Sequence, residues 1–425
     1  MINKRQAASI ILLPLTFLSM KGQPAANMGV LKTSWEPLCQ ATTDLNKVPS
    51  NVASSLKRAS MAIRDMLLES RRAAIYAQMH GTTENARKAA VIDANMFATA
   101  IRGLNHLINN DLTKGADLIN KAAYLKGSID DFLNLASGVK QGGEGCLVDT
   151  GATVTSNFNK KTAGTTECVT TLSPTTAEET KLTHLTPAGH SKAIAGTTEE
   201  NNQQAAGTAN CRLFSGDSTN GLAKTNNLAA PILWAAGYYK VKAGAGGEVS
   251  IADLRPGTLT TSPDHKQWTD FFSALAQKPD HEHANYANNS QNLHSDDLTE
   301  KLLVRALLND ATKSAEDAKN KREGIFGKPA DNAHTKIFAT ISDQKLPDKT
   351  GGVEAGTTLG SLKDATTLAA VLLSFELANM DKAQQKKELE AKKEKESTSL
   401  WETECNKIKD EGKCNATAAC SFNKT

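Results

Sequence analysis

Two long stretches with an apolar residue at every third or fourth position constrain the fold of this chain more than any other feature. In the first stretch these positions are Leu45, Val48, Val52, Leu56, Ala59, Ile63, Met66, Ala73 and Ala77. From Leu45 to Met66 the steps are of three and four residues and average about 3.5, the period of helices that pack as coiled coils. His80-Gly81-Thr82-Thr83 then interrupts the repeat, where Gly81 suits the end of one helix and a threonine suits the cap of the next.

A second stretch, from about Thr83 to Ser137, continues the repeat in the other direction of a hairpin. Its positions are Ala94, Phe97, Ile101, Leu104, Ile108, Asp111, Gly115, Leu118, Ala122, Leu125, Ile129, Phe132 and Ala136. Asp111 and Gly115 are poor choices for such a stripe and predict a local opening or bend. At ~1.5 Å per residue this arm would be roughly 80 Å long, which is typical of spacers, bundles and surface proteins. We therefore expect a mainly α fold built on an elongated antiparallel coiled-coil helical hairpin.

Composition and charge agree with a helical core. Hydrophobic residues make up 39% of the chain and aromatic residues only 5%, which favours an alanine-based helical core over a large sandwich or barrel. The 49 basic and 46 acidic residues give a net charge of +3, which argues against a nucleic-acid partner, since such proteins normally carry a concentrated basic face.

The first 26 residues have the pattern of a signal peptide. Lys4 and Arg5 precede an apolar run over 7–20, and the small residues Gly22, Ala25 and Ala26 follow it. The run is too short to span a membrane, which takes ~20 apolar residues. We therefore expect entry into the secretory pathway and removal of residues 1–26.

Cysteines and glycosylation sequons fit a secreted chain, in which thiols can oxidise. Of the seven cysteines, Cys39, Cys146, Cys168 and Cys211 are widely spaced, and Cys405, Cys414 and Cys420 lie together near the end. No pair has the C-x-x-C spacing of a metal or redox site, and the odd thiol is either free or paired with a cysteine beyond this sequence. Acceptor asparagines for N-glycosylation are Asn288, Asn415 and Asn423.

The rest of the chain divides by composition. From Gly138 to about Asn227, Gly, Thr, Asn and Lys predominate, which predicts a loop-rich head stapled by disulfides. The more apolar 228–254 is consistent with either a short sheet or a helix and hairpin. We expect helices at 298–321 and from about 359 to 377, then a charged linker or exposed helix at 382–400, and a small Cys-rich unit from Trp401.

Motifs for catalysis or cofactor binding are weak. His281-Glu282-His283 lacks the i, i+4 spacing that presents two zinc ligands on a helix, and Gly244-Ala245-Gly246-Gly247 lacks the last glycine of a dinucleotide-binding loop. No G-x-S-x-G elbow is present. We expect no enzyme, and hence no catalytic residue, cofactor or metal.

Several short strings resemble the trypanosome variant surface glycoproteins, and the four wide cysteines match the spacing of the class A N-terminal domain. The strings are Trp35-Glu36-Pro37-Leu38-Cys39, Lys88-Ala89-Ala90-Val91-Ile92, Leu125-Lys126-Gly127-Ser128-Ile129-Asp130, Cys211-Arg212-Leu213, Thr219-Asn220-Gly221-Leu222 and Ala235-Ala236-Gly237-Tyr238. The segment from Cys405 through Cys414 to Cys420 resembles the start of the family's C-terminal domain. Their order and spacing extend the resemblance over nearly the whole chain.

The resemblance implies disulfides Cys39–Cys168 and Cys146–Cys211, with the partners of Cys405, Cys414 and Cys420 left open. It implies a homodimer held to the outer leaflet of the plasma membrane by a GPI anchor. Such a protein is a surface coat antigen that shields the parasite, varies antigenically and meets host antibodies. The expected divisions are a signal peptide at 1–26, a rod-and-head domain at 27–381, the linker at 382–400 and a truncated C-terminal domain at 401–425. The sequence ends without an anchor signal, so either it is a fragment or the anchor rests on analogy.

Two other functions remain open at this level. The same scaffold serves receptors and serum-resistance proteins that bind a host ligand, and a secreted soluble adhesin would need no anchor. Dimerisation is expected from apolar residues beside the two stripes, since some would meet the late helix and the remainder a second protomer. These flanking residues are Leu67, Leu68 and Ile75 in the first arm and Val91, Leu107, Leu112, Ile119 and Leu133 in the second.

Overall fold

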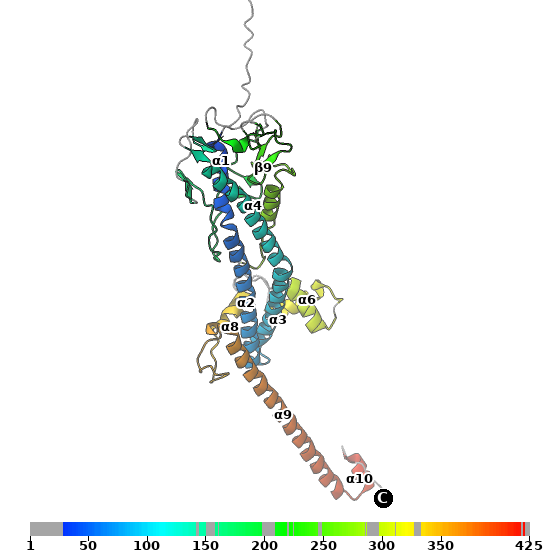
Figure 1. Cartoon of the computed structure of the whole chain (residues 1–425). Coiled ribbons are helices and arrows are strands. Elements are labelled where there is room, and N and C mark those ends of the chain that lie inside the picture. The colour runs from blue at the N-terminus through cyan, green and yellow to red at the C-terminus, as the bar shows by residue number, and fades with distance from the viewer. Residues whose placement is uncertain are drawn as a thin grey trace, which may run out of the picture. The chain divides into compact units, whose positions relative to one another are not determined.

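A computed structural model describes residues 29–141, 144–149, 158–159, 161–197, 209–218, 221–223, 225–244, 249–284, 286, 297–310, 312–326, 333–417 and 420. The expected signal peptide at 1–26 lies outside these residues. The chain folds into two compact units: the first combines Met1–Ser55 with Asn110–Pro279, and the second combines Leu56–Asn109 with Asp280–Thr425. Long helices dominate the fold, as the periodicity predicts (Figure 1).

The predicted helical hairpin is present. Helix α2 (Val48–His80) is followed by α3 (Glu84–His106), and Gly81 between them has a φ of 61°, which glycine adopts without strain. The Thr83 hydroxyl accepts a hydrogen bond from the Ala86 backbone N–H at 3.2 Å and caps α3. The helix boundary proposed at Gly81 and Thr83 is therefore confirmed.

The core of the second unit brings the hairpin together with elements from late in the chain. Buried side chains of α2 and α3 pack with those of α8 (Ala333–Asp343), the short helix η5 (Leu359–Ser361) and the start of α9 (Ala365–Lys407). The buried Arg72 side chain reinforces this packing, since its Nε and Nη2 donate to the carbonyls of Leu359 and Leu362 at 3.0 and 2.6 Å. The expectation that the late helix covers part of the hairpin is confirmed.

The helical character expected over 298–321 is present, but it is divided between two helices. The structure has α6 (Asp297–Leu308) and α7 (Ala315–Phe326), and Asn309 between them has a φ of 50°. Asparagine tolerates this left-handed conformation, which ends the first helix. Helices α5 (Lys266–Ala276) and α8 were not predicted.

The second arm of the hairpin contains a π-helical turn, η1 (Leu107–Asp111), between α3 and α4 (Leu112–Gly138). The opening expected near Asp111 is therefore present, and it takes the form of one wide helical turn.

The first unit packs α1 (Lys32–Leu45) and α5 against α4. Strands β9 (Ile232–Trp234), β10 (Tyr239–Val241) and β11 (Val249–Ile251) form an antiparallel sheet in the order β11-β10-β9. Tyr239 in the central strand pairs with Trp234 on one side and Ile251 on the other. Of the two possibilities for 228–254, the short sheet is correct.

Two-residue strands and loops make up much of the remaining first unit, as its composition predicts. Strand β1 (Val30–Leu31) pairs in parallel with β4 (Leu147–Val148). Strand β2 (Lys140–Gln141) pairs antiparallel with β3 (Glu144–Gly145), β5 (Thr162–Ala163) with β6 (Thr166–Glu167), and β7 (Leu185–Thr186) with β8 (Gly189–His190). A 3-10 turn, η2 (Arg212–Phe214), follows Cys211.

The charged segment expected as a linker at 382–400 lies within α9, and its residues 382–396 are exposed throughout. A short helix, α10 (Glu411–Ala416), follows. Of the helices that the structure describes, none combines the length and apolar character needed to cross a membrane.

Candidate functional site

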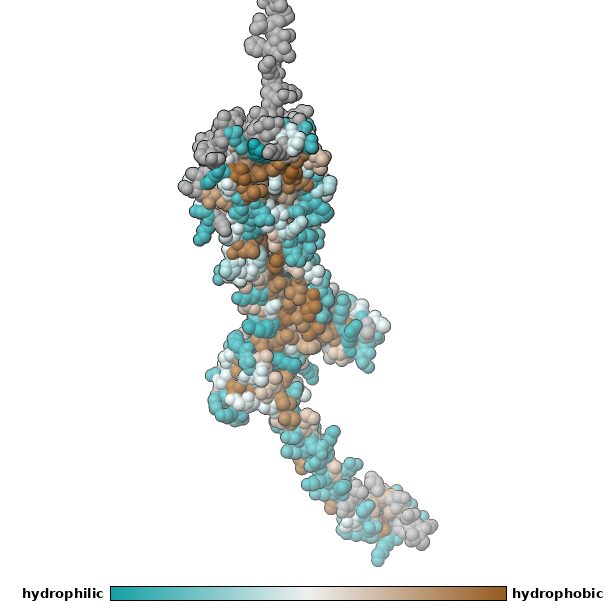
Figure 2. All heavy atoms as spheres, in the orientation of Figure 1, coloured by the Kyte–Doolittle hydropathy of each residue, from teal (hydrophilic) through white to brown (hydrophobic). Residues whose placement is uncertain are grey.

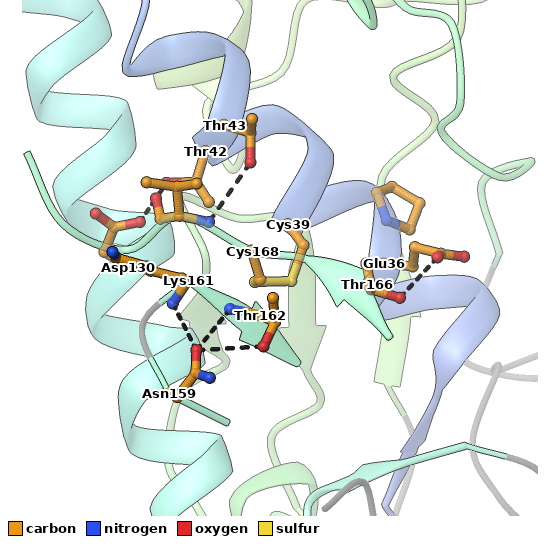
Figure 3. The surroundings of a disulfide bond; sticks show 12 residues. Glu36, Cys39, Thr42, Thr43, Asp130, Asn159, Lys161, Thr162, Thr166 and Cys168 are labelled. Carbon is orange, nitrogen blue, oxygen red and sulfur yellow. Dashed lines mark hydrogen bonds between the residues drawn. A yellow bond between two sulfur atoms is a disulfide. The ribbon is translucent and has the colours of Figure 1, made fainter. Parts of the chain in front are cut away.

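The disulfide Cys39–Cys168 joins helix α1 to the residue that follows strand β6, and both cysteines are fully buried. Polar contacts on both sides hold the two segments together (Figure 3). The Thr166 hydroxyl donates to Glu36 Oε1 at 2.9 Å, and the Val169 N–H donates to Thr43 Oγ1 at 3.4 Å. Residues 166–169 are thus attached to α1 by a disulfide bond and by hydrogen bonds.

A second disulfide, Cys146–Cys211, joins the residue before β4 to the residue before η2. Strand β4 is held in turn by Trp35 of α1, whose Nε1 donates to the Val148 carbonyl at 3.0 Å. Both pairs are those that the family resemblance implies. They link four segments of a unit whose strands are too short to be stable alone.

A buried charged cluster lies beside the first disulfide. Lys126 on α4 is 2% exposed, and its Nζ lies 2.9 Å from Asp130 Oδ2, one helical turn away. The same Nζ donates to Thr42 Oγ1 and to the Val169 carbonyl, each at 2.7 Å. The Thr42 hydroxyl donates to Asp130 (Figure 3), so the cluster ties α1, α4 and the loop after Cys168 together.

Burial shifts the pKa of both members of this pair towards the neutral form. It lowers the pKa of Lys126 and raises the pKa of Asp130, although the attraction between the two groups opposes both shifts. Lys126 and Asp130 lie within the family-like string Leu125–Asp130, but no individual role for them is predicted from the sequence. The i, i+4 spacing of opposite charges beside apolar stripe residues was the available signal.

Asp44 fixes the loop that leads into β7. Its fully buried Oδ2 accepts three backbone N–H groups, from Thr183 at 2.7 Å, His184 at 2.6 Å and Leu185 at 3.0 Å, and Lys47 reaches Oδ1 at 2.9 Å. Burial by itself raises the pKa of Asp44, but the bonds from His184, Lys47 and Leu185 outweigh it and leave the pKa below its usual value. Asp44 therefore remains an anion and acts as a structural anchor.

Near the end of the chain, Cys405 pairs with Cys420, a pairing that the sequence left open, while Cys414 is buried and forms no disulfide with another described cysteine. The acceptor Asn415 is exposed on α10. Asn288 and Asn423 lie outside the described residues, as do residues 245–247 of the glycine-rich run.

The histidine motif at 281–283 forms a turn in the second unit, and hydrogen bonds hold this turn in place. His281 is buried, its Nε2 lies 3.0 Å from the Gly103 carbonyl, and its Nδ1 accepts the His283 N–H at 3.1 Å. Both ring nitrogens of His281 are therefore engaged in hydrogen bonds.

An exposed apolar stripe on α3 and η1 corrects the predicted packing of the second arm. Phe97, Ile101, Leu104 and Ile108, which were expected to face the first arm, are exposed by 47%, 36%, 36% and 50%. Figure 2 shows hydrophobic surface gathered in the α3 region. The positions of α3 that are buried instead are Ala86, Ala89, Ile92, Asn95, Met96, Thr99, Ala100 and Gly103.

Two features produce this error: the buried face of α3 is lined largely by small residues, and a π turn follows that helix. Beyond Gly103 the buried positions continue at Leu107, Asp111 and Gly115, in steps of four, because η1 accommodates an extra residue. A repeat of constant period ignores this extra residue. It therefore assigns exposed positions of α3 and buried positions of α4 to one stripe. From Asp111 onwards the predicted positions are buried, as expected.

Comparisons with known proteins agree with this architecture. The model of the trypanosome variant surface glycoprotein family, A-type, matches residues 10–376. The chain belongs to this family. It is 31% identical over 397 residues to variant surface glycoprotein MITAT 1.2 of Trypanosoma brucei brucei, which covers 92% of this chain and 82% of that protein.

A second relative, variant surface glycoprotein MITAT 1.1 of the same organism, is 27% identical over 416 residues, covering 95% of this chain and 82% of the relative. The solved structure of MITat 1.1 has the same fold, with a TM-score of 0.77 and 24% identity over 86% of this chain and 100% of the other. Membership in the variant surface glycoprotein family makes the chain a surface coat protein.

Proposed function

We propose that this variant surface glycoprotein is a coat antigen that shields the parasite plasma membrane and is exchanged during antigenic variation, so that host antibodies meet it rather than the proteins beneath. The match to the A-type family over residues 10–376 carries the proposal. A stapled, loop-rich first unit supports it, because loops tolerate sequence change better than the helices that hold them.

The proposed localisation rests on the signal-like N-terminal residues and on the anchoring that is typical of the family. The signal-like residues 1–26 direct the protein into the secretory pathway, and a GPI anchor on the C-terminal domain holds it to the outer leaflet, as is typical of the family. In this proposal residues 27–381 form the exposed domain, 382–400 the spacer and 401–425 the start of the membrane-proximal domain. Asn288, Asn415 and Asn423 are the glycan acceptors, and the protein has no catalytic activity.

Dimerisation through the exposed stripe of α3 and η1 completes the proposed assembly. Phe97, Ile101, Leu104 and Ile108 follow one another at steps of four, three and four, which places them on one face. A continuous apolar face in solvent is unfavourable, and a second copy related by a two-fold axis covers it with the same residues.

The disulfide pairing is tested by peptide mapping without reduction. We expect a Cys39–Cys168 peptide and a Cys146–Cys211 peptide from the secreted protein, together with Cys405–Cys420. Two of these bridges close loops of 129 and 65 residues, each worth about 2–5 kcal/mol in a secreted domain. A Cys39–Cys146 peptide would overturn the assignment.

Surface copy number tests the coat function itself. Quantitative blotting of surface-labelled cells is expected to find this chain as the dominant surface protein, released by a phospholipase that cleaves GPI anchors. A scarce protein that binds one host ligand saturably would favour the receptor alternative. Release into the medium without any anchored pool would favour a soluble adhesin.

A further inference from the structure

The first unit contains a cavity that the proposed coat function does not use. It has a volume of about 520 Å³ and lies between the outer face of α4, strand β9 with its following turn, and helix α5. This volume falls within the range of about 300–1,000 Å³ that is usual for small-molecule sites.

Large apolar side chains stand in solvent around this cavity. Tyr124 and Leu135 of α4 are 66% and 44% exposed, and Leu233 of β9 is 42% exposed. Half-buried Trp234 also lines the cavity, and its ring centroid lies 6.3 Å from that of the buried Phe132. Figure 2 shows hydrophobic surface near the position of β9. Clustered apolar surface of this kind marks binding sites more often than isolated exposed residues do.

The wall formed by β9 and its turn is held in place. Trp234 Nε1 donates to the Leu213 carbonyl at 2.9 Å, and Trp268 Nε1 donates to the Ala235 carbonyl at 3.1 Å. Gly237 lies so close to the Asp264 carbonyl that an added Cβ would meet it at 1.8 Å. The site is therefore preformed, so ordering of the protein on ligand binding costs little free energy.

Its charge is negative. Asp264 is paired with Lys240 at 3.0 Å and Asp270 with Lys266 at 2.5 Å, so these acids are compensated. Asp131, exposed on α4, forms no hydrogen bond or ion pair with any residue that the structure describes. It lies between Tyr124 and Leu135 on the same helical face, since the spacings are seven and four residues.

We propose that this cavity binds small organic cations, that is, amines attached to an aromatic or branched apolar body. The ammonium group pairs with Asp131, and the apolar body packs against Leu135, Leu233 and the face of Trp234. Aromatic rings attract cations that lie over their faces, so Trp234 and Tyr124 add to the selectivity for a positive charge. Anionic ligands of the same shape are repelled by Asp131.

Calorimetric titration of the full chain with phenethylamine tests the proposal, with 2-phenylethanol as the neutral analogue. We expect saturable binding of the amine at one site per chain. The affinity for the alcohol should be lower by about fivefold, which is the effect of losing one exposed ion pair. Asp131→Asn is expected to weaken amine binding by a similar factor and to leave alcohol binding unchanged. Asp117→Asn is the matched control, because Asp117 lies on the same helix, is exposed and does not line the cavity.

Leu233→Gln is expected to weaken both ligands, because it removes apolar contact rather than charge. No saturable binding, equal affinity for amine and alcohol, or an unchanged affinity in Asp131→Asn would each overturn the proposal. So would a shift of the protein from dimer to monomer in Leu233→Gln, because a second copy would then be the occupant of this surface.

Discussion

Lys126 places a charge in the interior of the first unit, and removing it tests how much the buried cluster stabilises the fold. Lys126→Met leaves the Asp130 carboxyl with the Thr42 hydroxyl as its remaining donor in the cluster. Breaking a buried ion pair typically costs about 3–5 kcal/mol. Because Asp130 has a raised pKa and its side chain keeps 13% exposure, it can take up a proton, so we expect a loss of about 2–4 kcal/mol.

The measurement is urea unfolding with the disulfides intact, and the control is Lys121→Met. Lys121 pairs with Asp117 at 2.7 Å on the same helix, but both side chains are substantially exposed, so its loss should cost less than about 1 kcal/mol. Equal losses in the two variants would contradict a stabilising role for the buried pair.

His190 makes the stability of the first unit depend on pH. Its Nε2 lies 2.7 Å from the Pro37 carbonyl, its Nδ1 accepts the Lys192 N–H, and burial lowers its pKa from 6.5 to about 4. Between these values the unfolded chain binds the proton and the folded chain does not, so stability falls as pH falls from 6.5 towards 4. At pH 5 the expected loss relative to pH 7 is about 2 kcal/mol.

The test compares urea unfolding at pH 7 and pH 5 in the original protein and in His190→Gln. The glutamine amide can donate to Pro37 but does not titrate, so the variant should lose less stability between the two pH values. An identical loss in both proteins would mean that His190 does not carry this pH dependence.

These residue roles lie beyond what the sequence predicts. Oppositely charged residues four apart, such as Lys126 and Asp130, are common on exposed helices, and only their burial distinguishes them. Asp44 is a single acid at the end of a helix, and its partners at 183–185 are more than a hundred residues away. The disulfide pairs were inferred from family resemblance, since four cysteines allow three pairings.

At the scale of elements, the hairpin turn was predictable because its signals are local. Thr83 is expected to stabilise α3, since its hydroxyl satisfies the N–H of Ala86. Thr83→Ala should lower the free energy of unfolding by about 1 kcal/mol. Thr82→Ala is the control, because Thr82 is exposed and precedes the cap. A similar effect of both substitutions in thermal unfolding would contradict the capping role.

The packing of α3 was not predictable from the same periodicity. Its buried face is lined largely by small residues, such as Ala89, Ala100 and Gly103, whereas the exposed face carries Phe97 and Ile101. A count of large apolar residues therefore selects the wrong face. The π turn adds to the error, because an extra residue changes the register of buried positions without leaving a sequence signal as clear as proline.

At the scale of the whole molecule, the mainly α fold followed from repeats that extend over many turns, and the loop-rich first unit followed from its poverty in apolar residues. The short helices and the two-residue strands could not be predicted from the sequence, because they depend on contacts between segments that are distant in the chain. The same exposed face that the periodicity misassigned supplies the interface in the proposed homodimer.

The double variant Ile101→Asp with Ile108→Asp tests that interface. Both side chains lie in the exposed stripe, so charged replacements are compatible with the folded protomer but not with a buried apolar contact. Burial of apolar surface in the interface contributes about 25 cal/mol per Å² to the free energy of association, which the variant loses in part. The two new carboxylates of one protomer would also face those of its partner and repel them. We expect the full chain to sediment as a dimer at micromolar concentration and the variant to sediment as a monomer with an unchanged unfolding transition. Leu389→Asp on the exposed part of α9 is the matched control and should remain dimeric. A double variant that stays dimeric would place the interface on another surface.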